Sequence, residues 1–185
     1  MFSSEQGIVQ VLWRAVSAAR AKLRVLVRKA ETLARQPIFV LVWLAPVWAM
    51  IGFASAAIRL VTLRNLAPVL GRNLGAVALV PLANPAQARR AVQIQQTVAI
   101  AIKYAPFRSD CYPQAIVAQV LCRVFGLPAV AHFGLRLDSD SEDKRRLFAH
   151  AWVVCGRTAI CGEYGSFRAY NVVGCFASPA VLAST

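Results

Sequence analysis

The feature that most constrains this chain is a run of uncharged, mostly apolar residues over positions 38–58. A helix needs about 20 apolar residues to cross a bilayer, so this run is long enough to do so. Pro46 lies inside the run, and membrane helices tolerate proline. The run therefore predicts a helix that either spans a membrane or docks on the rest of the protein or on a partner.

The segment before this run predicts a basic amphipathic helix over residues 8–35. Residues 1–72 contain ten Lys or Arg and two acids, a net charge of +8, whereas residues 73–185 contain eleven and six, a net charge of +5. This excess of positive charge in the N-terminal part of the chain favours an anionic membrane surface or an acidic peptide as the partner. The basic residues form no nucleic-acid-binding motif, so we expect no nucleic acid partner.

The cysteines bear on the cellular compartment. Five cysteines are present, an odd number, and no CxxC pair occurs among them. We therefore expect free thiols in a reducing cytoplasm, with no metal and no cofactor. No cleavable signal peptide is expected. The denser positive charge before the run would keep the N-terminus of a spanning helix in the cytoplasm, which would place the rest of the chain outside. This conflict favours a docked or peripheral helix, with the protein cytoplasmic or at the inner face of the membrane.

The remaining pattern predicts a second region with its own core. Residues 73–88 are rich in glycine, proline and asparagine and predict a connector, and a helix is expected over about 86–104. Accordingly, we expect an N-terminal helical segment over 1–85 and a catalytic domain over 86–185. Strands are predicted in that domain over residues 129–137, 147–154 and 158–161.

A cysteine opens the helix that precedes these strands. The chain reads PFRSDCYPQA over residues 106–115, with Ser109 as the expected N-cap and Cys111 in the first turn, and Gly126 ends the helix. Unpaired backbone N–H groups at a helix start stabilise a thiolate, so we expect a lowered pKa for the Cys111 thiol and a nucleophilic role. The alternative is a buried, inert cysteine, which is our interpretation of Cys122, Cys155 and Cys175.

The chain contains two histidines, and both are candidates for the base. His150 lies in the predicted strand over 147–154 and shares a face with Phe148 and Trp152, because side chains alternate along a strand. Apolar neighbours favour the neutral imidazole that a general base requires. His132 is the competing base. A histidine in an apolar strand can also be an ordinary core residue.

A thiol and an imidazole together perform acyl transfer through a thioester. Backbone N–H groups near Cys111 are candidates for holding the oxyanion. If water attacks the thioester, the result is hydrolysis, and if an amine attacks, the result is transamidation. The residues alone leave both outcomes open.

A larger set of spaced residues can be compared with known families. The set consists of Pro106-Phe107-Arg108-Ser109, Cys111, Gln114-Ala115, Arg123, Gly126-Leu127-Pro128, Gly134, Ala149-His150-Ala151-Trp152-Val153 and Gly162. Together these residues resemble the lasso-peptide biosynthesis B proteins, which are transglutaminase-like cysteine peptidases. The resemblance covers about residues 86–177.

The resemblance implies a papain-like core in which Cys111 is the nucleophile and His150 the base. It further implies removal of the leader from a lasso-peptide precursor, before a separate ATP-dependent cyclase, similar to asparagine synthetase, closes the macrolactam ring. Family members often carry an Asp on the strand after the histidine. Here no Asp is present in that region, and Glu163 is the nearest acid. Glu163 is thus a candidate for orienting the imidazole, with a backbone carbonyl or a solvated loop carboxylate as alternatives.

Some relatives carry a fused winged-helix domain that recognises the leader. Residues 1–85 lack the alternating strands of such a domain, so a separate leader-recognition protein is expected as a partner. The expected fold is α+β: an N-terminal apolar and basic helical segment, then a transglutaminase-like core with a cysteine-bearing helix on a small antiparallel sheet. The alternative functions are a non-catalytic, membrane-associated scaffold of the maturation complex and a transamidase acting on another peptide.

Overall fold

The computed structural model describes residues 20, 23–24, 27, 35–61, 63–107, 109–137, 147–163 and 165–183. Most of the basic helix predicted over 8–35 lies outside these residues. The chain divides into two compact units, Met1–Leu41 and Val42–Thr185. All of the sheet belongs to the second unit, and this unit positions the candidate site.

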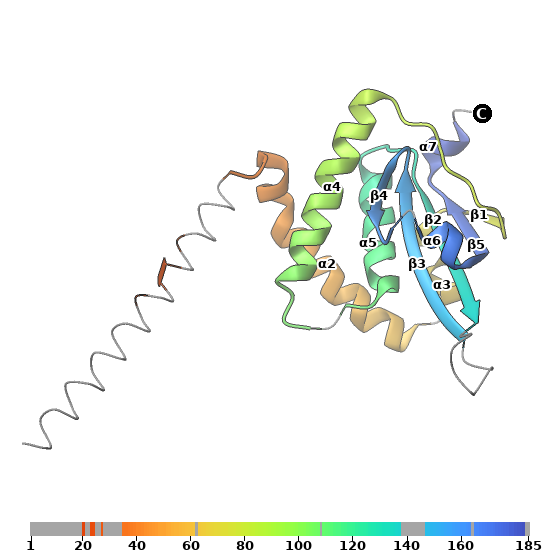
Figure 1. Ribbon diagram of the computed structural model, residues 1–185, viewed down its shortest axis with the longest axis horizontal. Coiled ribbons are helices and arrows are strands. Elements are labelled where there is room, and N and C mark those ends of the chain that lie inside the picture. The colour runs from red at the N-terminus through yellow and green to blue at the C-terminus, as the bar shows by residue number, and fades with distance from the viewer. Residues whose placement is uncertain are drawn as a thin grey trace, which may run out of the picture. The chain divides into compact units, whose positions relative to one another are not determined.

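Figure 1 shows the helices and strands of the chain. The helices are α2 (Ile38–Leu60), α3 (Leu63–Leu70), α4 (Pro85–Lys103), α5 (Cys111–Val124), α6 (Ser166–Ala169) and α7 (Pro179–Leu182). The strands are β1 (Arg72–Gly75), β2 (Val130–Leu137), β3 (Leu147–Cys155), β4 (Thr158–Cys161) and β5 (Asn171–Ala177). The strands form one sheet in the order β1-β5-β2-β3-β4, and each neighbouring pair is antiparallel.

Helices α4 and α5 lie side by side, with α4 against β4 and α5 against β3 (Figure 1). The start of α4 is fixed by a capping box, in which Asn84 accepts from the backbone of Gln87 and Gln87 accepts from the backbone of Asn84. The end of α5 is fixed by Gly126, whose φ of +62° is readily adopted only by glycine. The α+β architecture with a cysteine-bearing helix on a small antiparallel sheet is confirmed.

The boundary expected at residue 85 does not coincide with a boundary in the fold. Strand β1 pairs with β5 at one edge of the sheet, and α3 lies against α5. Residues 63–75 are therefore part of the sheet-bearing unit rather than of a separate N-terminal segment. The connector predicted over 73–88 contains the end of β1, because four residues with a terminal glycine give too short a pattern to indicate a strand.

A buried glutamine joins these parts. The Nε2 atom of Gln119, in α5, donates to the carbonyl oxygens of Leu70 at 2.9 Å, Phe176 at 3.2 Å and Ala129 at 3.4 Å. The side chain is fully buried. One amide thus connects the end of α3, strand β5 and the segment before β2.

Removing this amide should destabilise the fold. In a Gln119→Leu variant the buried carbonyl groups lose the hydrogen bonds from this amide, and we expect the free energy of unfolding to fall by about 1–3 kcal/mol. Denaturant unfolding of the purified chain measures this change. The matched control is Gln96→Leu, at an exposed position of α4, which should stay within about 0.5 kcal/mol of the wild type. Equal stability of the two variants would contradict a structural role for the Gln119 amide.

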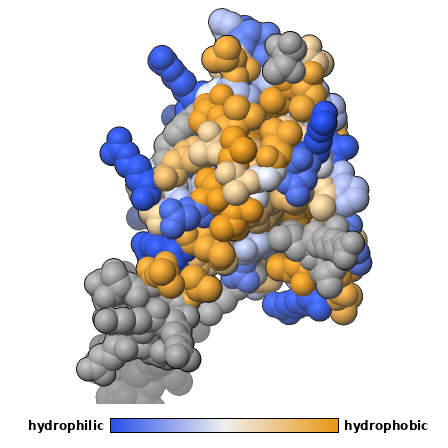
Figure 2. Space-filling model, turned by 90° about the vertical axis from the view of Figure 1, so that its right-hand side faces the viewer, coloured by the Kyte–Doolittle hydropathy of each residue, from blue (hydrophilic) through white to orange (hydrophobic). Residues whose placement is uncertain are grey.

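Helix α2 is uncharged from Ile38 to Ile58 and continues through Pro46. By length and composition it is apolar enough to cross a membrane, and it is mostly exposed. Apolar side chains are also exposed elsewhere. Figure 2 views the side of the molecule at β1, β5 and α7, where apolar side chains form much of the surface. Exposed residues of these segments and of the loop after β1 include Val77, Val80, Val173 and Leu182.

Candidate active site

Cys111 is the first residue of α5, and the preceding Asp110, rather than the expected Ser109, is the N-cap. The loop before the helix is held by Gln114, whose Nε2 atom donates to the carbonyl oxygen of Ser109 at 2.8 Å. The Cys111 sulfur accepts hydrogen bonds from the backbone N–H groups of Ala151, Tyr112 and Cys111 itself. The sulfur therefore lies where the start of α5 meets strand β3.

The resting state of this thiol differs from the expectation. The backbone N–H groups lower the pKa of Cys111, but burial raises it more strongly, and the neighbouring Asp110 carboxylate raises it further. The pKa of Cys111 is therefore above its usual value of 9.0. The thiol is neutral near pH 7, so it needs a base to become a nucleophile.

The sulfur lies at an edge of β3 that none of the described strands covers. Strand β4 pairs with β3 only from Val153 onwards, where Val153 is opposite Cys161. The Val153 N–H donates to the Cys161 thiol, and the Ala151 N–H, two residues earlier, donates to Cys111. The two sulfurs therefore follow one another along the same edge, and Cys111 takes the place that a longer β4 would fill.

His150 precedes Ala151 in β3. Its imidazole stacks on Trp152, with ring centroids 5.8 Å apart, and lies 5.0 Å from the Tyr170 ring. Burial lowers the pKa of His150, and the Glu163 carboxylate opposes this by raising it. Since the pKa remains below its usual 6.5, the imidazole is neutral near pH 7, which is the form that accepts a proton.

Gly162 packs closely against Trp152 beside this imidazole. A Cβ atom at position 162 would lie 2.5 Å from the Cβ of Trp152 and 3.3 Å from the Nε2 atom of His150. The φ of Gly162 is +70°, which also disfavours any other residue. Position 162 is therefore restricted to glycine by the packing of β3.

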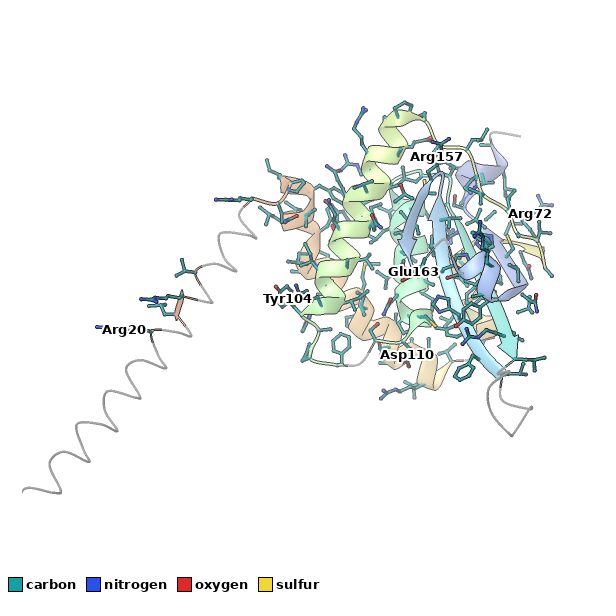
Figure 3. All side chains as sticks on the ribbon, viewed as in Figure 1. Arg20, Arg72, Tyr104, Asp110, Arg157 and Glu163 are labelled. Carbon is teal, nitrogen blue, oxygen red and sulfur yellow. The ribbon has the colours of Figure 1, made fainter. Side chains whose placement is uncertain are left out.

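The structure places Cys111, His150 and Glu163 around one stretch of strand edge. Cys111 contacts the residue after His150, and Glu163 interacts electrostatically with His150 from the turn after β4. Figure 3 labels Glu163 near the end of β4 and Asp110 at the start of α5. Glu163 is exposed. The imidazole stands on the Trp152 face of β3, whereas the sulfur lies at the strand edge.

The competing base, His132, lies in the core. It is fully buried, and its Nε2 atom accepts a hydrogen bond from the Leu79 N–H at 3.3 Å. Its ring stacks on Trp152 at 5.4 Å and meets Phe167 edge-on at 4.8 Å. Burial lowers the pKa of His132 to about 4. These contacts are those of a structural histidine.

Sequence reasoning missed several groups at this site. The Ala151 N–H and the Cys161 thiol both depend on which strands are neighbours, which no local pattern reveals. Tyr170, the residue before β5, contacts His150 with its ring tilted by 31° to the imidazole, and the Arg136 guanidinium lies 5.3 Å from the Tyr170 ring. Among the residues that the structure describes, no group of three or more His, Cys, Asp or Glu side chains is arranged to hold a metal ion.

Comparison with known families adds to this geometry. Residues 55–175 match the family model described as the transglutaminase-like superfamily. The chain belongs to the transglutaminase-like superfamily. The matched residues begin inside α2 and include Cys111, His150, Glu163 and nearly all of the sheet. No match was found among curated proteins or among solved structures.

Transglutaminase-like domains are typically enzymes with a catalytic cysteine and histidine. In this transglutaminase-like chain, the match starts at residue 55, well before the region over which the lasso-peptide resemblance extends. This agrees with the fold, in which α3 and β1 belong to the same unit as the cysteine and histidine.

Proposed function

We propose that this chain is a cysteine peptidase that removes the leader from a lasso-peptide precursor, with Cys111 as nucleophile and His150 as base. The observation that carries the proposal is the position of the Cys111 sulfur, which accepts the N–H of Ala151, the residue that follows a neutral His150. The spaced motifs that resemble the lasso-peptide B proteins support the choice of substrate.

In the proposed first step, His150 takes the thiol proton as the sulfur attacks the carbonyl carbon of the scissile peptide bond. The resulting oxyanion is stabilised by backbone N–H groups near the start of α5. The imidazolium then gives its proton to the departing amine, which leaves a thioester on Cys111. His150 next accepts a proton from water as the water attacks the thioester, and the products are a free carboxylate and the regenerated thiol.

Glu163 has an electrostatic role in this proposal. A carboxylate near the ring favours the imidazolium that forms when the proton moves, as its effect on the pKa of His150 indicates. The carboxylate is exposed, so solvent weakens its effect. Its position makes it a positioning and charge-stabilising group rather than a residue that touches substrate.

The proposed partners follow from the same function. A separate leader-recognition protein presents the precursor, and a separate ATP-dependent cyclase uses the freed core peptide. The chain acts in the cytoplasm, at the inner face of the membrane. These assignments rest on the resemblance of the spaced motifs and on the basic, apolar front of the chain.

The direct test incubates the purified full chain with an intact precursor peptide and measures the product masses. Hydrolysis gives two fragments whose masses sum to that of the precursor plus one water, with a free carboxylate on the leader. A product that carries an added amine would instead identify a transamidase. Absence of any product with the leader-recognition protein present would contradict both enzymatic proposals and favour a scaffold.

The pH dependence of cleavage follows from the shifted pKa values of His150 and Cys111. Protonation of His150 removes the base, so kcat/KM should fall on the acid side with a midpoint below 6.5. Ionisation of the free thiol has a midpoint above 9.0, so the profile should be a broad plateau between these limits. In a Glu163→Gln variant the influence that raises the pKa of His150 is lost, and the acid midpoint should move to lower pH.

Asp110→Asn is the matched control for this measurement. Asp110 raises the pKa of Cys111, so its removal should lower the alkaline midpoint and leave the acid midpoint unchanged. An acid midpoint that rises in Glu163→Gln, or that moves equally in both variants, would contradict the pairing of Glu163 with His150.

A further inference from the structure

Helix α2 is attached to the sheet-bearing unit by one of its faces. The buried residues along this face are Val47, Ile51 and Ala54. Beside them, Trp43 meets Phe125 edge-on, with ring centroids 5.1 Å apart, and Trp48 lies 5.9 Å from Phe107. The spacing of these contacts follows successive helical turns, so a continuous stripe of α2 is already occupied by protein.

The opposite face of α2 is exposed and contains no polar side chain. The large residues on this face are Val42, Phe53 and Leu60, which are 62%, 77% and 86% exposed. The remaining exposed positions between them include Ala45, Pro46, Ala49 and Ala56. A helix that lies on a protein in water normally turns charged or polar residues outward. We therefore expect this second apolar stripe to be buried in an apolar environment.

The charges around α2 indicate what kind of environment this is. From Ile38 to Ile58 the helix has no charge, and the first charged residue after this stretch is the exposed Arg59. The chain has a net charge of +13, and its first 72 residues contribute +8 of it. An apolar stripe within a strongly basic region is complementary to a bilayer with anionic headgroups. The stripe is buried among the lipid tails, and the headgroups attract the basic side chains.

The occupied stripe also argues against a spanning helix. To cross a bilayer, α2 would have to withdraw Val47, Ile51 and Trp43 from the protein and expose the surface that they cover. A helix that lies in the plane of the interface keeps these contacts and buries only its outer face, by roughly 5–10 Å. In this arrangement one stripe of α2 is buried against the protein and the other is buried in the lipid.

We propose that α2 lies in the plane of an anionic membrane surface, with its Val42–Phe53–Leu60 face in the lipid and its Val47–Ile51 face on the catalytic unit. The contact also reaches the candidate site. Phe107 lies four residues before Cys111, and its ring contacts Trp48. The ring also lies beside Gly52, where a Cβ atom would be 3.5 Å from it. The helix that meets the lipid thus supports the loop that leads into the nucleophile at the start of α5, and the proposal does not depend on which reaction that nucleophile performs.

The test measures co-flotation of the purified full chain with phosphatidylcholine vesicles that contain or lack phosphatidylglycerol. We expect binding to the anionic vesicles and roughly tenfold weaker binding by a Val42→Glu/Phe53→Glu double variant, since charged residues strongly disfavour lipid. The matched control is Leu82→Glu/Val173→Glu, two residues that are exposed elsewhere in the unit and should leave binding unchanged. Failure of the wild type to bind, or equal binding by both double variants, would overturn the proposal.

Two further readouts keep the result interpretable. Thermal unfolding of the double variants shows whether the introduced charges disturb the fold, and both should melt within a few degrees of the wild type because the changed residues are exposed. Trypsin added outside the vesicles should cut after both Arg35 and Arg59 when α2 lies in the plane. Protection of one of the two sites would identify a spanning helix and overturn the in-plane arrangement.

Discussion

A Cys111→Ala variant is expected to lose leader cleavage by a factor of roughly 10³–10⁶. The neighbouring Cys161 thiol should not replace it, because Cys161 is buried and burial raises its pKa to about 12. The sulfur is the only nucleophilic atom that the structure places against the Ala151 N–H beside His150. The change removes one half-buried atom, so the fold should persist. Single-turnover cleavage of the precursor, followed by mass spectrometry, measures the loss.

The control for this variant is Cys122→Ala, in the same helix. Cys122 is fully buried three turns along α5. Its removal leaves a small cavity, with an expected loss of stability of about 1 kcal/mol and cleavage within a few-fold of the wild type. If Cys111→Ala still cleaves at the wild-type rate, the peptidase proposal is wrong, and a scaffold role becomes the better interpretation of the fold.

Replacement of His150 by Gln should reduce kcat by roughly 10²–10⁴-fold, which is the usual contribution of a general base. Gln cannot accept the thiol proton, and the pKa of Cys111, raised by burial, leaves little thiolate to react without help. The acid limb of the pH–rate profile should also disappear, since its titrating group is gone. The measurements are the rate of thioester formation and its dependence on pH.

His132→Gln distinguishes the two histidines. His132 stacks on Trp152 and Phe167 in the core, so its loss should lower the melting temperature while the folded protein retains its kcat. The opposite pattern, with an active His150→Gln and a folded but inactive His132→Gln, would assign the base to His132. A melting curve for each variant separates loss of fold from loss of chemistry.

The parts of the fold that the sequence predicted are those with a local pattern. Helix α4 lies within one residue of its predicted range because an Asn84 cap and a run of helix-forming residues define it. Strands β2, β3 and β4 follow alternating or continuous apolar runs and were predicted within a residue or two. Gly126 ends α5 as expected.

The parts that escaped prediction depend on contacts between distant residues. Strand β5 lies between β1 and β2 in the sheet, but Asn171 and Gly174 interrupt its apolar pattern. The pKa of Cys111 was predicted to fall from the helix start alone, whereas the burial that raises it comes from packing against β3. Glu163 was named from its position in the chain. Its electrostatic interaction with His150 depends on the course of the turn after β4, which no local pattern predicts.

The glycine at position 162 has a consequence for how firmly the imidazole is held. Because even one methyl group there would collide with Trp152, the main chain after β4 packs directly on the indole that stacks on His150. A side chain at position 162 would displace that indole, and the imidazole with it. A residue with no functional group thus controls where the base is placed, by the close approach of its backbone alone.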